Sequence, residues 1–199
     1  MIKSLLVFLT FPVFLLFTGC GGGARYVDPT GPNTIVTVNE IDIQDWANAA
    51  DQMVQNLLAS GVLDRSAQQP AVLAISRIVN NTSQQVDTNL LTKQIRVALN
   101  QSGKAVTTTT VGLGGTAEDP LAKDQAAYES FRSGGDGSPA VQPGYSLSGR
   151  LIETRATAGS VQQMTFTFQL SLTEIATGLA VWEDQVDITK QGRRPRVGW

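Results

Sequence analysis

Few side chains in this 199-residue sequence could do chemistry, because it contains no histidine and a single cysteine, Cys20. Histidine is the usual general acid or base near neutral pH and the most common zinc ligand. Its absence excludes Ser-His-Asp and Cys-His sites, histidine-bound metals and HExxH proteases. The serines and threonines have no histidine to activate them. A lone cysteine also cannot form a disulfide within the chain or a thiolate metal site.

Three carboxylates near the C-terminus are the remaining candidates: Glu183, Asp184 and Asp187. Paired carboxylates can hydrolyse glycosides. The segment is predicted to be a strand, in which neighbouring side chains point to opposite faces, so Glu183 and Asp187 share one side and Asp184 faces the other. A solvated edge strand that carries charge against aggregation explains them better. We therefore expect no enzyme activity, no cofactor and no metal site.

The N-terminus gives Cys20 a role. Lys3 precedes a 13-residue apolar run, Leu5 to Phe17, which is too short for the roughly 20 residues of a membrane-spanning helix and is typical of a signal peptide. The ending Leu16-Phe17-Thr18-Gly19-Cys20 resembles a bacterial lipobox, with Phe17 where leucine is usual. The alternative is an ordinary secretory signal with an accidental cysteine. We predict a signal peptide over 1–19, cleavage between Gly19 and Cys20, and lipidation of Cys20.

The residue after the cysteine bears on location. Several acyl chains together anchor a protein stably to a membrane. Gly21 stands where bacterial sorting rules place aspartate to retain a lipoprotein in the inner membrane. By resemblance to that rule, we predict an outer-membrane lipoprotein that faces the periplasm.

Composition indicates one folded domain between two less regular ends. The chain is 42% hydrophobic, and its net charge of -2 argues against a nucleic-acid binder. Residues 20–40, rich in Gly, Pro, Asn and Thr, are predicted to be a flexible lipidated tether. Residues 41–190 form the predicted globular domain. In the tail, Lys190, Arg193, Arg194 and Arg196 occur without an acid, and we favour a solvated, disordered basic end (191–199) over a docking segment.

Periodicity and capping residues predict an α+β fold, a small mixed and antiparallel sheet covered by helices. An amphipathic helix is expected from Asp42 to Ser60, with Asp42 as N-cap. The segment from Val72 to Thr110 predicts strand, helix and strand, a connection long enough for a parallel crossover. The remaining expectations are a turn over Asn80 to Ser83, helices over 87–101 and 120–131, and an antiparallel meander over 145–157, 164–173 and 179–189.

At several points the sequence resembles the globular domain of LpoB-type activators, outer-membrane lipoproteins that stimulate a bifunctional penicillin-binding protein. The resemblance covers about Asp42 to Lys190 and implies a sheet covered by helices, similar also to the amino-terminal domain of TolB-like proteins. The matching stretches are Asp45-Trp46 with Met53, Leu57, Leu58, Gly61 and Val62; Val79-Asn80-Asn81-Thr82; Ile95-Arg96-Val97-Ala98-Leu99 before Gly103-Lys104; Tyr145-Ser146-Leu147-Ser148-Gly149; and Thr177-Gly178-Leu179-Ala180-Val181-Trp182.

The resemblance implies docking onto a noncatalytic regulatory domain of a bifunctional penicillin-binding protein, with no nucleic-acid or small-molecule partner. The alternative is a structural or accessory envelope lipoprotein of the broader TolB-like or curli-pore-like group. The loop with Asn80, Asn81 and Thr82 and the loop Ser133 to Gly144 are candidates for the partner-binding face, and a surface loop without function is the alternative for each. Well-studied members of the family carry a long proline-rich linker, whereas this tether is only about twenty residues long. A closer partner, a narrower periplasm or a divergent role would fit it.

Overall fold

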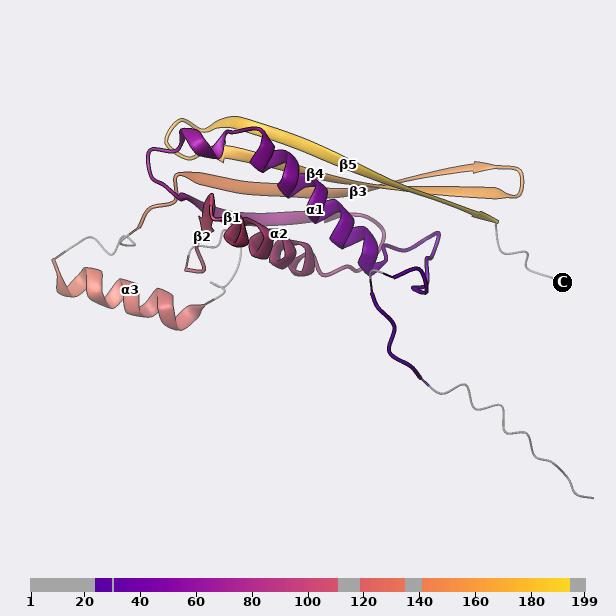
Figure 1. Cartoon of the computed structure of the whole chain (residues 1–199), viewed down its shortest axis with the longest axis horizontal. Coiled ribbons are helices and arrows are strands. Elements are labelled where there is room, and N and C mark those ends of the chain that lie inside the picture. The colour runs from indigo at the N-terminus through magenta and orange to yellow at the C-terminus, as the bar shows by residue number, and fades with distance from the viewer. Residues whose placement is uncertain (1–23, 30, 111–118, 135–140, 194–199) are drawn as a thin grey trace, which may run out of the picture.

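Five strands form one mixed sheet in the computed structural model, which describes residues 24–29, 31–110, 119–134 and 141–193. The strand order is β2-β1-β3-β4-β5 (Figure 1). The element bounds are β1 Ala71–Asn81, β2 Ala105–Thr107, β3 Tyr145–Ala158, β4 Val161–Glu174 and β5 Leu179–Arg193.

The strands pair in the directions that the sequence predicts: a parallel pair joined by a crossover helix, and an antiparallel meander. Strand β1 pairs in parallel with β2 and with β3, whereas β3, β4 and β5 form an antiparallel meander. The connection from β1 to β2 contains a helix, as a parallel crossover requires. These pairings confirm the predicted α+β class with a small mixed sheet.

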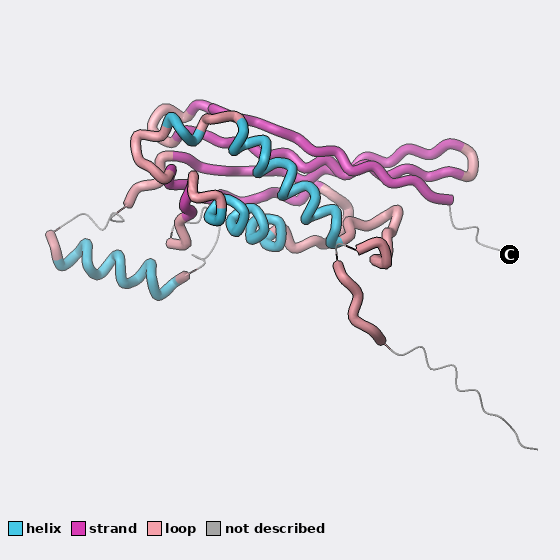
Figure 2. The backbone as a smooth tube through the Cα atoms, in the orientation of Figure 1, coloured by secondary structure: helices cyan, strands magenta, loops and turns pink. Residues whose placement is uncertain are grey.

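Two helices cover one face of this sheet. Helix α1 (Ile43–Ala59) and helix α2 (Asn89–Gln101) cross the same side, as Figure 2 shows. A short 3-10 turn, η1 (Leu63–Arg65), follows α1. Helix α1 begins after Asp42 and is followed by Gly61, whose φ of 69° is a backbone conformation that glycine adopts without steric cost. Among the described residues, no helix has the length and apolar character needed to cross a membrane.

The core lies between these helices and the inner face of the sheet. Strand β4 alternates buried apolar residues with half-buried polar ones, as its sequence predicts. The Trp46 ring of α1 meets the Phe168 ring of β4 edge to face, with 5.5 Å between centroids and 80° between planes. Other large side chains that are fully buried include Met53, Leu57, Leu91, Ile95, Leu99, Met164 and Phe166.

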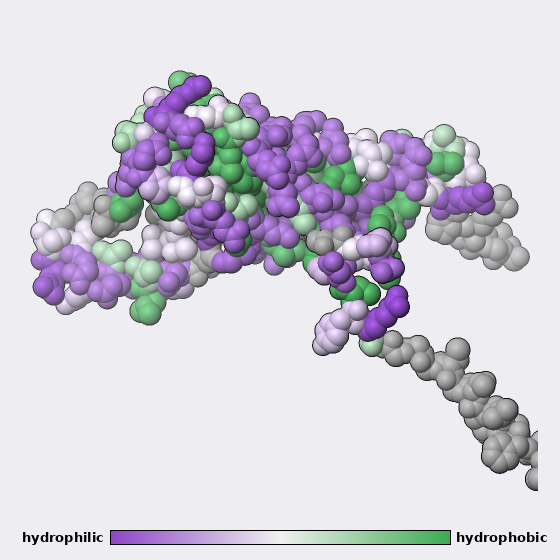
Figure 3. Space-filling view, viewed as in Figure 1, coloured by the Kyte–Doolittle hydropathy of each residue, from purple (hydrophilic) through white to green (hydrophobic). Residues whose placement is uncertain are grey.

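Helix α3 (Pro120–Arg132) stands apart from this core. Asp119 caps it by accepting a hydrogen bond from the backbone N–H of Ala122 at 3.0 Å. None of its residues is buried, and Leu121 and Phe131 are 79% and 80% exposed. Figure 3 shows hydrophobic atoms at the surface of this helix, which lies beyond the end of the sheet in Figure 1. The sequence predicts the helix correctly, but its apolar side chains do not join the core.

Four elements have bounds that differ from the sequence prediction. Helix α2 begins at Asn89, because the Asp87 carboxylate accepts the Asn89 N–H at 2.9 Å and so precedes the first turn. The strand predicted over 72–79 runs from Ala71 to Asn81, so it includes the first two residues of the predicted turn. The strand predicted over 104–110 is only three residues long, Ala105–Thr107. Strand β5 continues to Arg193, so the strand takes in the start of the predicted basic end.

Candidate functional site

The predicted partner-binding loop lies where β1 ends. Asn80 and Asn81 are the last two residues of the strand, and Thr82 follows it. The Asn80 side chain shapes the turn: its Oδ1 accepts the Thr82 N–H at 3.0 Å and the Thr82 hydroxyl at 2.7 Å, and its Nδ2 donates to the Gln84 carbonyl at 2.7 Å. Asn81 is exposed. The loop is therefore a hydrogen-bonded turn whose free side chain is that of Asn81.

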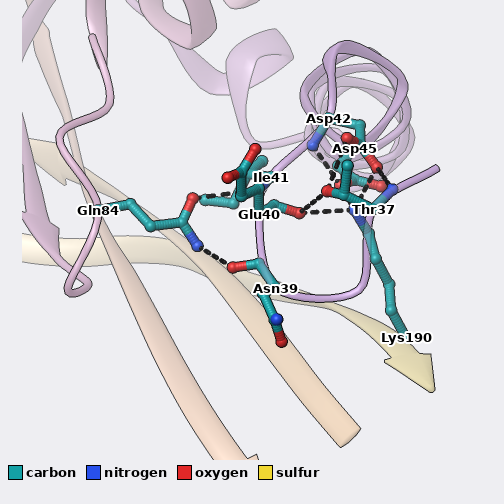
Figure 4. Close-up of polar contacts among 8 residues, drawn as sticks. All are labelled: Thr37, Asn39, Glu40, Ile41, Asp42, Asp45, Gln84 and Lys190. Carbon is teal, nitrogen blue, oxygen red and sulfur yellow. Dashed lines mark hydrogen bonds and ion pairs between the residues drawn. The ribbon is translucent and has the colours of Figure 1, made fainter. Parts of the chain in front are cut away.

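Gln84 connects this turn to the base of the predicted tether. Its Nε2 donates to the Asn39 carbonyl at 2.7 Å, and its Oε1 accepts the Ile41 N–H at 3.2 Å (Figure 4). On the other side of the segment, Gln162 of β4 donates to the Asn39 side chain. Val38 is partly buried against the core. The last residues of the segment that the sequence assigns to the tether thus contact the domain.

A buried lysine of β5, Lys190, contacts the same segment before α1. The Lys190 ammonium lies 2.7 Å from an Asp42 carboxylate oxygen and 2.5 Å from one of Asp45, and it donates to the Glu40 carbonyl at 2.8 Å. Lys190 is 8% exposed, and its ammonium lies 5.7 Å from the centre of the Phe166 ring. Lys190, which carries the first positive charge of the basic C-terminal segment, is therefore buried, and residues 191–193 of the predicted disordered end belong to β5. Residues 194–199 of that end lie outside the described residues.

Asp42 and Asp45 serve both the helix and the junction. The Asp45 carboxylate accepts the Asp42 N–H at 2.8 Å, and the Asp42 carboxylate accepts the Thr37 N–H at 2.8 Å and its hydroxyl at 2.9 Å. Burial alone would raise the pKa of Asp42, but the hydrogen bonds from Lys190 and Thr37 outweigh it and lower that pKa. The carboxylate is thus held in its charged form.

We call Thr37, Glu40, Asp42, Asp45, Gln84 and Lys190 the junction cluster. Its single ammonium pairs with two carboxylates, and its polar atoms bond to one another, to backbone groups or to both. This arrangement fixes where the segment leading from the N-terminus leaves the domain. The chemistry it supports is structural, because the ammonium and the carboxylates are engaged with each other.

The sequence predicts Asp42 as the N-cap of α1 but does not predict the cation that Asp42 and Asp45 share. One signal was present: in β5, Val186, Ile188 and Lys190 occupy alternate positions, so Lys190 falls on the face that carries the buried valine. A lysine on the inner face of a strand requires a buried partner.

The three C-terminal carboxylates divide as predicted. Glu183 and Asp187 lie on the outer face of β5, where they accept hydrogen bonds from the Ser171 hydroxyl at 2.8 Å and the Thr167 hydroxyl at 2.6 Å. Asp184 lies on the other face and accepts from the Asn56 side chain of α1 at 2.7 Å. The described part of the chain contains no group of three or more potential metal ligands. Strand β5 is also the edge strand that the sequence predicted.

The predicted processing site, Gly19 and Cys20, and the whole of the signal peptide over 1–19 lie outside the described residues.

Comparison with known proteins gives one sequence match and several structural ones. The sequence model of a family described as peptidoglycan-synthase activator LpoB matches residues 45–188, more than half of the chain. No curated protein matches the chain.

Three solved structures illustrate the structural matches. The C-terminal domain of LpoB from Escherichia coli is 16% identical, with a TM-score of 0.44, over 72% of this chain and 98% of that one. The NMR structure of E. coli LpoB is also 16% identical, with a TM-score of 0.42, over 96% and 84%. A lipoprotein from Neisseria meningitidis is 13% identical, with a TM-score of 0.38, over 64% and 88%.

Proposed function

The chain belongs to the LpoB family of peptidoglycan-synthase activators, and we propose that it binds the regulatory domain of a bifunctional penicillin-binding protein and raises the activity of that enzyme. The observation that carries this proposal is the family match over residues 45–188, which spans most of α1, all of α2 and α3, and nearly all of the sheet. Regulation of a synthase places the chain in cell-wall biogenesis.

We propose that the chain acts by binding and has no catalysis of its own. The sequence supports this, because it lacks histidine entirely. The structure gives a second argument: Glu183 and Asp187 lie on the opposite face of β5 from Asp184, and each accepts a hydrogen bond from a neighbouring side chain. Such carboxylates do not face each other across a substrate.

We further propose that Cys20 anchors the chain in the outer membrane facing the periplasm, after its thiol is diacylated, the chain is cleaved between Gly19 and Cys20, and the new amino terminus is acylated. The support is the sequence around the cysteine and Gly21 after it. Replacement of Cys20 by alanine should block lipidation and the cleavage that depends on it, so the variant should be missing from the outer-membrane fraction. Retention of the variant in the outer membrane would contradict the lipid anchor.

The junction cluster limits the distance that the domain can move away from a membrane in which Cys20 is anchored. Because Thr37 is bonded to Asp42, the free tether runs from Cys20 to Thr37, which is 17 steps along the chain. Fully extended, this segment spans about 56 to 61 Å, and as a flexible coil it spans about 21 to 25 Å on average. The partner's regulatory domain must therefore come close to the outer membrane.

A longer tether tests this limit. If reach is limiting, insertion of a flexible Gly/Ser segment before Thr37 should leave activation in cells intact or improve it. Loss of activation on lengthening would contradict the idea.

A pull-down tests the proposed partnership directly. The mature chain is immobilised on a support and incubated with detergent-solubilised membranes of the same bacterium. Bound penicillin-binding proteins are then detected with a fluorescent penicillin. Enrichment of a bifunctional synthase is expected. Absence of any enriched synthase would favour the accessory envelope lipoprotein instead.

In the same assay, Asn81→Ala tests the predicted binding loop, because Asn81 is exposed whereas Asn80 shapes the turn.

A further inference from the structure

A groove runs between helix α1 and the free edge of the sheet. It has a volume of about 610 Å³ and is lined on one side by Asn48, Asp51, Gln52 and Gln55 of α1. These four residues follow the i, i+3, i+4, i+7 spacing of a single helix face, and all are exposed. The other wall is β5, from Val186 to Thr189.

The second wall shows which part of β5 the groove reaches. Successive side chains of a strand point to opposite faces of the sheet. Four consecutive residues of β5 line the groove, so the groove follows the strand's edge and not one of its faces. Strand β5 pairs with β4 on one side, and within the described residues no strand pairs with its other side. An exposed edge of this kind can accept a further strand.

The chemistry of the walls selects the occupant. Val186, 6% exposed, and the partly buried Ile188 give an apolar floor, and the amides of the α1 wall can donate and accept hydrogen bonds. Asp51 and Asp187 add negative charge from both walls, and α1 contains no lysine or arginine. The groove therefore favours an extended segment that carries lysine or arginine.

The same charges oppose self-association through this groove. A second copy of β5 would bring another Glu183, Asp184 and Asp187 against an acidic groove. Like charges placed together at an interface are unfavourable, and charged edge strands resist unwanted pairing. A foreign strand of opposite charge is thus a better occupant than a second copy of this chain.

We propose that an extended, basic segment of the synthase adds to the sheet along the edge of β5 at residues 186–189, with its Lys or Arg side chains against Asp51 and Asp187. The inference rests on the proposed function, since it assigns the docking surface for that partner.

The register of the sheet links this surface to the predicted loop. Asn81, Ile152, Thr167 and Asp187 pair with one another in turn across β1, β3, β4 and β5. They form one row on the outer face of the sheet, and three strand spacings put its ends about 14 to 15 Å apart. A domain whose strand occupies the groove could therefore also contact Asn81.

Charge reversal in the full chain tests the proposal. Asp51→Lys changes an exposed residue in the groove, and Asp51→Lys/Asp187→Lys changes both walls. Asp124→Lys on α3 is the matched control for the single variant, and Asp124→Lys/Glu129→Lys is the matched control for the double variant, with the same change of charge at exposed sites on another element. Binding of the purified bifunctional synthase to each variant is measured by titration. The double variant should weaken binding at least about tenfold, whereas both controls should bind like the wild type.

Hydrogen–deuterium exchange separates strand addition from a simple charge effect. Addition of the synthase should slow exchange of amides within residues 186–189. Groove variants that bind as tightly as their controls, or a complex that leaves these amides unprotected, would overturn the docking surface and leave the proposed function standing. Failure of the wild-type chain to bind any bifunctional synthase would instead overturn the proposed function, and this inference with it.

Discussion

Replacement of Lys190 by methionine is the sharpest test of the junction cluster. Methionine keeps a long unbranched side chain but removes the ammonium and its contacts to Asp42, Asp45 and the Glu40 carbonyl. The side chains of Asp42 and Asp45 are only 13% and 10% exposed, so the variant leaves two carboxylates with little access to water. Removal of one partner from a buried ion pair costs about 3 to 5 kcal/mol.

Urea denaturation of the mature chain measures this cost. For an m-value of about 2 kcal/mol/M, the midpoint should fall by about 1.5 to 2.5 M. Lys104→Met is the matched control, because Lys104 pairs with Asp64 at 3.2 Å while the two side chains are 45% and 56% exposed. An exposed pair of this kind contributes about 0 to 1 kcal/mol.

A triple variant separates the loss of the lysine from the cost of orphaned charge. Lys190→Met combined with Asp42→Asn and Asp45→Asn should recover part of the lost stability, because no unpaired carboxylate remains. The amides of the segment before α1 should also exchange faster in the single variant, because Lys190 no longer holds that segment. If Lys190→Met cost no more than Lys104→Met, the junction cluster would not have the energetic role assigned to it.

Three further predictions concern pH, a close backbone contact and the isolated helix. Burial opposes ionisation of Asp42, but its bond to Lys190 helps to lower the pKa of Asp42 in the folded state. The ionised Asp42 therefore contributes to the stability of the fold in full above about pH 4, and this contribution is lost as the pH falls through the folded pKa. Urea midpoints at pH 6 and pH 3 should differ more for the wild type than for Asp42→Asn. Gly149→Ala should cost about 1 to 3 kcal/mol in the same assay, because the added Cβ would lie 2.7 Å from a backbone oxygen of β4. Thermal unfolding should show that Phe131→Ser stays within about 0.5 kcal/mol of the wild type, whereas Phe166→Ala, at a buried position, costs about 3 to 5 kcal/mol; equal effects would contradict the position of α3 outside the core.

Much of the fold could be predicted because its signals are local. The N-cap Asp42, the apolar stripe after it and Gly61 define α1 within one residue at either end. The alternation over Met164 to Thr173 gives both the strand and its buried face. The split of Asp184 from the carboxylates beside it follows from the same period of two.

The junction cluster could not be predicted because its partners are distant in sequence. Lys190 and Asp42 are 148 residues apart, and nothing local links the two. Gln84 contacts Asn39 across 45 residues for the same reason. The groove also depends on tertiary structure, since it exists only where α1 lies beside an edge strand from the far end of the chain. For helix α3, local residues predict the helix correctly, but they do not determine whether Phe131 is buried in the core.

The activity of the synthase itself tests the central claim most directly. Polymerisation of glycan strands by each purified bifunctional penicillin-binding protein of the same bacterium is measured with and without the mature chain. We predict that the rate of at least one synthase rises with the concentration of the chain and saturates, and that the Asp51→Lys/Asp187→Lys variant needs a higher concentration for the same effect. Rates that do not change for any of these synthases would contradict the account.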